Sequence, residues 1–254
     1  MEHIIHLSKD KKLKKIISPE RPFVLQMRTN VYLHLCYSIM SQQLSTKVAD
    51  VFHRRFLALY KGKEPSAKQI ALTAFETLRS IGLSNAKANY VLNVCRFFIA
   101  EKITDARLHK MSDEEIIKYL SQIKGVGQWT VEMVLMFTLG REDVFALDDL
   151  GIQQAICKLY DIDAADKKEM KRQMLKTSAK WSPYRTYACM YLWGGRIIQQ
   201  ANKDDIFLKR CHLYLPYDHL QIFFIRFIKM IQYFTINIKN SRYLVVGKYR
   251  HNNF

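Results

Sequence analysis

The chain has 254 residues, 49% of them hydrophobic and 25% charged, as expected for a globular protein with one or two domains. Its 40 basic and 23 acidic residues give a formal charge of +17, which favours nucleic acid as a partner over an anionic membrane surface, with a merely solvated basic surface as the alternative. The five cysteines form no Cys-x-x-Cys pair, so we expect no zinc or iron–sulfur site. Neither a secretory leader nor an uncharged apolar run of about 18 residues occurs, so we expect neither secretion nor a membrane span.

Residues 9–200 are predicted to be mainly helical, because Gly and Pro are scarce and apolar residues recur at spacings of three and four. A first basic helix should end before Pro19. Residues 30–40 are apolar nearly all round, as in a buried central helix, and Ser45 could cap the helix after it. Further helices are expected over 67–80, from a cap at Ser84 or Asn85 to about 100, over 165–180 and over 183–200.

Two helices around a Gly-x-Gly turn form the strongest local signal. Ser112 and Glu115 have the spacing of a capping box at the start of the first helix. After the turn at residues 125–127, the second helix begins near Gln128. Backbone N–H groups at such a turn and helix start could bind a phosphate without reading base sequence. An ordinary turn between two helices is the alternative.

Two adjacent carboxylates, Asp148 and Asp149, follow a short apolar run and open the next helix. A single Asp here would be read as an N-cap. Because there are two, one can cap the helix while the other faces a cleft.

The composition changes from about residue 201. Residues 201–254 hold 11 of the 31 aromatic residues but only one Gly and one Ala. Helix and strand patterns compete there, so we divide the chain into a helical domain, 1–200, and a basic, aromatic-rich extension of unknown structure, 201–254. Three interpretations of residues 201–254 remain open: a surface-bound extension, a segment foreign to the ancestral domain, and a docking segment.

The run I-K-G-V-G-Q-W-T-V-E-M-V, followed by D-V-F-A-L-D-D-L-G-I, resembles the helix–hairpin–helix DNA glycosylase superfamily, in its DNA-3-methyladenine glycosylase II branch. Residues 41–45, 81–88 and 181–193 match further segments of that family in order, and the resemblance covers about residues 3–196. It implies an all-α fold of two helical subdomains flanking an active-site cleft. The helix–hairpin–helix would span about 113–139, and the C-terminal extension is atypical.

The resemblance makes Asp149 the catalytic carboxylate, because the family's catalytic Asp precedes an apolar residue by three positions, as Asp149 precedes Ile152. Asp148 then becomes the cap or a supporting residue. In this family the damaged nucleotide is flipped out of the duplex. The ionised carboxylate would stabilise the cationic sugar as the base leaves and would orient water.

The base pocket implied by the resemblance consists of Trp129, Met133 and Trp193, whose aromatic faces would hold a cationic base. Core packing is the alternative for each tryptophan. Some relatives carry an aromatic residue in place of Met133. In the bifunctional branches the position of Trp129 is a lysine that attacks the sugar. An indole cannot do so, which predicts hydrolysis that leaves an abasic site.

The implied DNA-binding residues are Leu83, Ser84, Gly125, Val126, Gly127 and Gln128. The loop from Leu83 to Asn85 would carry the wedge that fills the gap in the base stack, with a buried loop leucine as the alternative for Leu83. Arg185 could support the last helix of the domain or reach the DNA, and we favour the supporting role. The family's hairpin also holds a monovalent cation, Na⁺ or K⁺, and the matching ligands are the backbone carbonyls of Ser121, Ile123 and Val126. No other cofactor and no iron–sulfur cluster are expected.

These residues predict a monofunctional base excision repair glycosylase that hydrolyses the N-glycosidic bond of alkylated purines, of the 3-methyladenine and 7-methylguanine type, in double-stranded DNA. The rival interpretations are a non-catalytic helix–hairpin–helix module that binds distorted DNA and a bifunctional enzyme. We expect a monomer, located in the cytoplasm at the nucleoid if the source is bacterial and in the nucleus if it is eukaryotic.

Overall fold

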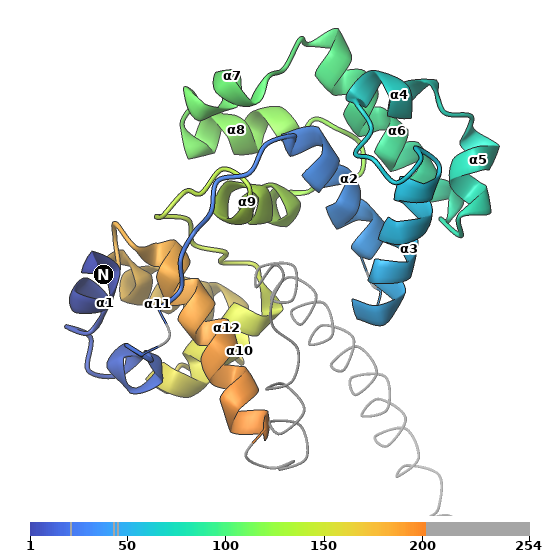
Figure 1. Ribbon diagram of the computed structural model, residues 1–254. Coiled ribbons are helices and arrows are strands. Elements are labelled where there is room, and N and C mark those ends of the chain that lie inside the picture. The colour runs from blue at the N-terminus through green and yellow to red at the C-terminus, as the bar shows by residue number, and fades with distance from the viewer. Residues whose placement is uncertain (21, 43, 45, 202–254) are drawn as a thin grey trace, which may run out of the picture.

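The computed structural model describes residues 1–20, 22–42, 44 and 46–201, and within these ranges the chain is all helical, without a strand (Figure 1). The elements are α1 (Glu2–Leu7), η1 (Leu13–Ile16), α2 (Val31–Ser41), α3 (Thr46–Ala58), α4 (Ala67–Leu72), α5 (Phe75–Ser80), α6 (Asn85–Ala100), α7 (Asp105–His109), α8 (Asp113–Leu120), α9 (Gln128–Phe137), α10 (Leu150–Tyr160), α11 (Lys167–Ala179) and α12 (Arg185–Ala201). This confirms the all-α prediction. Apart from its first residue, the extension predicted for 201–254 lies outside the described residues, so the domain boundary stays a prediction.

The helices form two groups, with α9 between them (Figure 1). In one group α6 packs against α2, α4 and α5, and α3 packs against α2. In the other, α12 packs against η1 and α10, and α10 packs against α11. The chain crosses from η1 to α2 and returns after α9, so the group with α10–α12 is built from two separate stretches of sequence, whereas the group with α2–α6 is one continuous stretch. No helix in the described ranges is long and apolar enough to cross a membrane.

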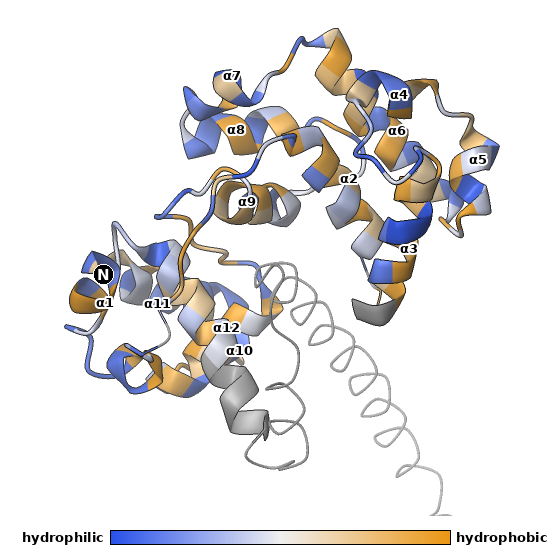
Figure 2. Cartoon of the chain, in the orientation of Figure 1, coloured by the Kyte–Doolittle hydropathy of each residue, from blue (hydrophilic) through white to orange (hydrophobic). Residues whose placement is uncertain are grey.

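Two helices are buried nearly all round. In α2, six apolar side chains have no exposed surface: Val31, Leu33, Leu35, Cys36, Ile39 and Met40. This confirms the prediction of a buried central helix. In α9 every residue from Thr130 to Phe137 is buried, and Figure 2 colours most of this helix as hydrophobic. Because α9 contacts both α8 and α2, it has no solvent-facing side over these residues.

Two of the predicted helix caps are confirmed among the residues that the structure describes. Ser112 and Glu115 form a capping box at the start of α8. Ser84, one of the two candidate caps, accepts the N–H of Lys87 at the start of α6. Ser45 lies outside the described residues. The structure also has a capping box at Ser66 and Gln69 that the sequence analysis missed.

The predicted first basic helix is wrong. The chain instead forms α1, a turn and the short 3₁₀ helix η1. The reason is Asp10, whose Oδ1 accepts the backbone N–H groups of Lys12 and Leu13 at 3.0 and 3.2 Å. Such bonds from a side chain to its own backbone compete with a continuous helix.

Asp10 also joins the N-terminal segment to the second group of helices. Its Oδ2 accepts the Tyr160 hydroxyl at 2.5 Å and the Trp181 indole N–H at 3.0 Å, and Lys180 Nζ lies 2.8 Å away. The Asp10 side chain is only 6% exposed. Burial raises its pKa, but these donors outweigh burial and hold the pKa well below the ordinary value. The ionised side chain is therefore the one that the folded protein stabilises.

We expect Asp10→Asn to lower the free energy of unfolding at pH 7 by about 1.5–3 kcal/mol, the usual worth of hydrogen bonds to a charged group. Because the folded pKa is depressed, this stabilisation is present above the unfolded pKa of about 3.9 and is lost as pH falls below it. Urea unfolding of wild type and variant from pH 7 to pH 3 measures the difference. A gap that stays constant down to pH 3 would contradict the assignment.

Candidate active site

Asp149 is the N-cap of α10 and lies almost fully buried, with 2% of its surface exposed. Its Oδ1 accepts the backbone N–H of Ile152 at 2.8 Å and the indole N–H of Trp193 at 2.9 Å. Its Oδ2 accepts the indole N–H of Trp129 at 2.9 Å. Three chain segments that are distant in sequence therefore meet at one carboxylate.

The expectation that Asp148 would be the cap is wrong. Asp149 itself caps α10, because its extended backbone turns the carboxylate back over the first N–H groups of the helix. Asp148 lies at the surface, where its Oδ1 is 2.5 Å from Lys171 Nζ and its side chain is 51% exposed. The cap is therefore the same residue, Asp149, that the resemblance makes the catalytic carboxylate; its catalytic role stays a prediction.

Two opposing effects act on the Asp149 carboxyl. Burial raises its pKa, while the N–H groups of Trp193, Ile152, Trp129 and Gly151 lower it, and the net shift is upward. All the partners are N–H donors directed at the two oxygens. A protonated carboxyl would place its own O–H against one of those donors, so the surroundings match the ionised form. The carboxylate is desolvated, yet each of its oxygens accepts at least one N–H.

Trp129 and Trp193 come together at Asp149, as the resemblance implied, but their indole N–H groups make the contact. Trp193 is 2% exposed, and its ring centroid lies 6.0 Å from that of Phe137. Trp129 is half-buried. Met133, one turn after Trp129 on α9, is buried. The residue pattern pointed to the ring faces and did not reveal the role of the indole N–H groups. The role of these three residues as a base pocket stays a prediction.

Glu132 is a second buried carboxyl in this region, and the sequence analysis missed it. It is 3% exposed, and its Oε1 accepts the side-chain amide N–H of Gln128 at 2.9 Å. Burial raises its pKa, and the charges of Asp148 and Asp149 raise it further. The signal was present, because Glu132 is the one charged residue in the apolar run V-E-M-V-L-M-F, which precedes the carboxylate pair by ten residues, 138–147.

The two glycines of the hairpin differ in their surroundings. Gly125 has a φ of 103°, and a Cβ added there would lie 2.2 Å from Cγ and 2.6 Å from Cβ of Tyr90 on α6. Gly127 caps α9, and its Cβ would meet nothing within 4 Å. Packing against Tyr90 therefore explains Gly125, whereas nothing in the described fold requires a glycine at position 127. Gln128 is exposed at the start of α9, where the first N–H groups have no acceptor within the helix.

The carbonyls expected to hold a cation belong to the same turn. The carbonyl of Ile123 accepts the N–H of Val126 at 2.9 Å, which leaves it a second lone pair. Ser121 ends α8 as its C-cap. Within the described ranges no group of three His, Cys, Asp or Glu side chains is placed to hold a metal ion. The cation site stays a prediction.

Leu83 does not fit the wedge expectation, because its side chain has no exposed surface and belongs to the core. The structure matches the alternative of a buried loop leucine. Ser84 is occupied as the cap of α6. Next to them, Lys87 Nζ donates to the carbonyls of Met40 and Gln42 at 3.0 and 2.6 Å, so this loop lies beside the end of α2.

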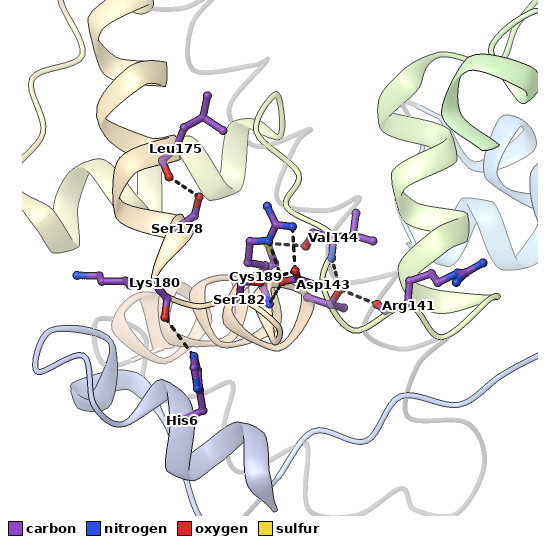
Figure 3. A network of polar contacts seen from close by, with 11 residues as sticks. His6, Arg141, Asp143, Val144, Leu175, Ser178, Lys180, Ser182 and Cys189 are labelled. Carbon is purple, nitrogen blue, oxygen red and sulfur yellow. Dashed lines mark hydrogen bonds and ion pairs between the residues drawn. The ribbon is translucent and has the colours of Figure 1, made fainter. Parts of the chain in front are cut away.

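Arg185 binds Asp143, which fits the supporting role predicted for it, and that role stays a prediction. Its guanidinium donates to both oxygens of Asp143, from Nε at 2.8 Å and from Nη2 at 2.9 Å. Figure 3 shows Asp143 in a network with Ser182, whose hydroxyl lies 2.7 Å from Oδ2. The network fixes the start of α12 against the segment that leads to Asp149.

Comparisons with known proteins agree with this geometry. A family model described as HhH-GPD superfamily base excision DNA repair protein matches residues 36–180, which include the hairpin, Trp129 and Asp149. DNA-3-methyladenine glycosylase 1 of Schizosaccharomyces pombe is 35% identical over 185 residues, which cover 72% of this chain and 80% of the relative.

Two solved structures are similar as well. The Schizosaccharomyces pombe 3-methyladenine DNA glycosylase in complex with abasic DNA has a TM-score of 0.66 and 34% identity, over 76% of this chain and 95% of that one. A DNA-3-methyladenine glycosidase from Bacillus halodurans has a TM-score of 0.67 and 32% identity, over 76% and 88% of the two chains. Fold, hairpin and carboxylate thus point to one family.

Proposed function

The chain belongs to the HhH-GPD superfamily of base excision DNA repair proteins, and from this we infer that it is a DNA glycosylase of the 3-methyladenine type, which excises alkylated bases. The observation that carries the inference is Asp149. It is a buried carboxylate surrounded by N–H donors, at the start of α10, the helix that comes after the two helices of the hairpin. A module that only binds distorted DNA has no need of such a carboxylate, and nothing among the relatives favours that alternative.

The chemistry follows from the charges at the site. An N-alkylated purine is cationic and already a fair leaving group, and its departure leaves a cationic sugar. An ionised carboxylate in a desolvated site stabilises that cation far more than it would in water. Asp149 can also orient the water that completes the hydrolysis. The target base must first leave the duplex, because a stacked base exposes no path to its glycosidic bond.

We propose that the reaction is monofunctional. Trp129 occupies the position at which the bifunctional branches carry their nucleophilic lysine, and its indole N–H is hydrogen-bonded to Asp149 Oδ2 at 2.9 Å. An indole provides no amine to form a Schiff base. The product would be an abasic site in an uncut strand.

Double-stranded DNA with alkylated bases is the proposed substrate. The hairpin with Gly127 and the start of α9 presents backbone N–H groups suited to phosphate, and the formal charge of +17 favours a polyanion. A monovalent cation held by the carbonyls of Ser121, Ile123 and Val126 would add positive charge at this turn. We further propose a monomer that is located where the DNA is, in the bacterial cytoplasm or the eukaryotic nucleus.

A base-release assay tests the function. We expect the protein to release 3-methyladenine and 7-methylguanine from methylated duplex DNA and to leave strands that break only after alkali treatment. Release of no methylated base by folded, DNA-binding protein would overturn the proposal. Trapping of a covalent DNA complex by borohydride would instead show a bifunctional enzyme.

Trp193→Phe keeps the buried ring but removes the N–H donor to Asp149. One donor fewer raises the pKa of Asp149 further, so the acid limb of the pH–rate profile should move upward by about one unit. The ionised carboxylate is then lost at a higher pH, and the rate should fall most below neutral pH. Profiles of base release under single-turnover conditions measure the shift.

Trp181→Phe is the matched control, because the Trp181 indole N–H donates to a different buried carboxylate, Asp10. It should lower stability and leave the pH profile in place. An equal shift in both variants would show that the effect arises from general loosening of the fold.

A further inference from the structure

The carboxyl of Glu132 lies in an apolar helix and has few partners. Every residue of α9 from Thr130 to Phe137 is buried, and Glu132 is one of them, three residues after Trp129. Its Oε1 has one donor, the Gln128 amide, and its Oε2 is buried with no hydrogen-bond partner among the described residues. An ionised carboxylate in that position would leave one oxygen unsolvated, which is costly.

Asp149 presents the opposite case. Its two oxygens accept the N–H groups of Ile152, Trp193 and Trp129, and it caps a helix. Asp149 is therefore equipped to carry a charge, whereas Glu132 is not. When two carboxyls that interact electrostatically have such different surroundings, the one with fewer donors binds a proton more readily.

Among the residues that the structure describes, no cation is one of the groups that shift the pKa of Glu132. The start of α10 contributes Asp148 and Asp149, whose charges disfavour ionisation of Glu132. Asp148 is itself paired with Lys171 at the surface. On α12, the thiol of Cys189 is buried, and its raised pKa keeps it neutral. Within α9 the partner is the neutral amide of Gln128.

We propose that Glu132 is a positioning residue that holds a proton at neutral pH, so that of these two buried carboxyls only Asp149 carries a negative charge. The consequence for catalysis rests on the proposed function, but the protonation state of Glu132 does not. When Glu132 is neutral, Asp149 is the one of the two that carries the negative charge opposite the sugar cation. Gln128, at the exposed start of α9, stays hydrogen-bonded to the buried carboxyl of Glu132.

Infrared spectroscopy of the full-length protein tests the protonation state directly. We expect a C=O stretching band of a protonated carboxyl at pH 7 that shifts on labelling with ¹³C-glutamate and is absent in Glu132→Gln. The control Glu114→Gln, at an exposed position on α8, should leave the band unchanged. If the band is missing in wild type, or if Glu132 titrates near the ordinary value of about 4.3, the proposal is wrong.

The pH profile of base release gives a second readout. Glutamine imitates the protonated side chain, so Glu132→Gln should keep the neutral-pH rate within about threefold and leave the acid limb in place. If Glu132 were ionised in wild type, its neutralisation would move the acid limb to lower pH by about one unit, which would overturn the proposal. Absence of base release in wild type would defeat the proposed function, while the infrared result would still decide the state of Glu132.

Discussion

Asp149→Asn is expected to lower the rate of base release by about 10²- to 10⁴-fold, the usual range for loss of a group that transfers or directs a proton at the reacting centre. The substitution removes the negative charge that would stabilise the sugar cation. It also turns an amide N–H toward one of the indole donors, Trp129 or Trp193, in place of an acceptor oxygen. Single-turnover release of methylated base from duplex DNA measures the loss.

The fold should survive this substitution, because Asn is as good an N-cap as Asp and keeps an acceptor for the N–H of Ile152. DNA affinity should therefore be retained, so that the defect lies in the chemical step. Asp148→Asn is the control: its side chain is exposed, and its ion pair with Lys171 is of the surface kind that contributes about 0–1 kcal/mol. Its rate should equal that of wild type. Comparable losses of base-release rate in both variants would show that Asp149 has no special role.

Gly125→Ala is expected to reduce the free energy of unfolding by about 2–6 kcal/mol. Two costs add up. The φ of 103° lies where residues with a Cβ are strained, and the new Cβ would overlap with Cγ and Cβ of Tyr90. Those atoms lie close to the backbone of α6, so the tyrosine cannot simply swing away. Thermal unfolding should show a clear drop in Tm, since about 1 kcal/mol corresponds to about 2–4 °C in a protein of this size.

Gly127→Ala is the matched partner of that variant. Its φ is −95° and its Cβ would enter open space, so stability should change by no more than about 0.5 kcal/mol. DNA affinity should nevertheless fall, because the added methyl group stands where a phosphate would approach the N–H groups of the hairpin. Fluorescence anisotropy with a duplex that contains an abasic-site analogue measures this. Unchanged affinity would mean that the hairpin is not the phosphate clamp.

Much of the fold could be predicted because its signals are local. Ser112 and Glu115 form a capping box within one turn, and the apolar residues around Leu35 identify a buried helix without knowledge of its neighbours. The prediction of the first helix was wrong, because the Asp10 side chain bonds to the N–H groups of Lys12 and Leu13 and interrupts the helical pattern. That competition depends on a side-chain conformation that packing against Trp181 fixes.

The sequence by itself determined that the chain is helical, that a Gly-x-Gly hairpin precedes a carboxylate pair, and which residues resemble a glycosylase site. Only the tertiary structure decided what those residues do to one another. It brought the indole N–H groups of Trp129 and Trp193, 20 and 44 residues away from Asp149, to opposite oxygens of one carboxylate. It also placed Leu83 in the core and buried Glu132, where the charge of Asp149 raises the pKa of the glutamate. Capping and periodicity are set by neighbours along the chain, whereas hydrogen-bond partners and burial depend on how whole helices pack.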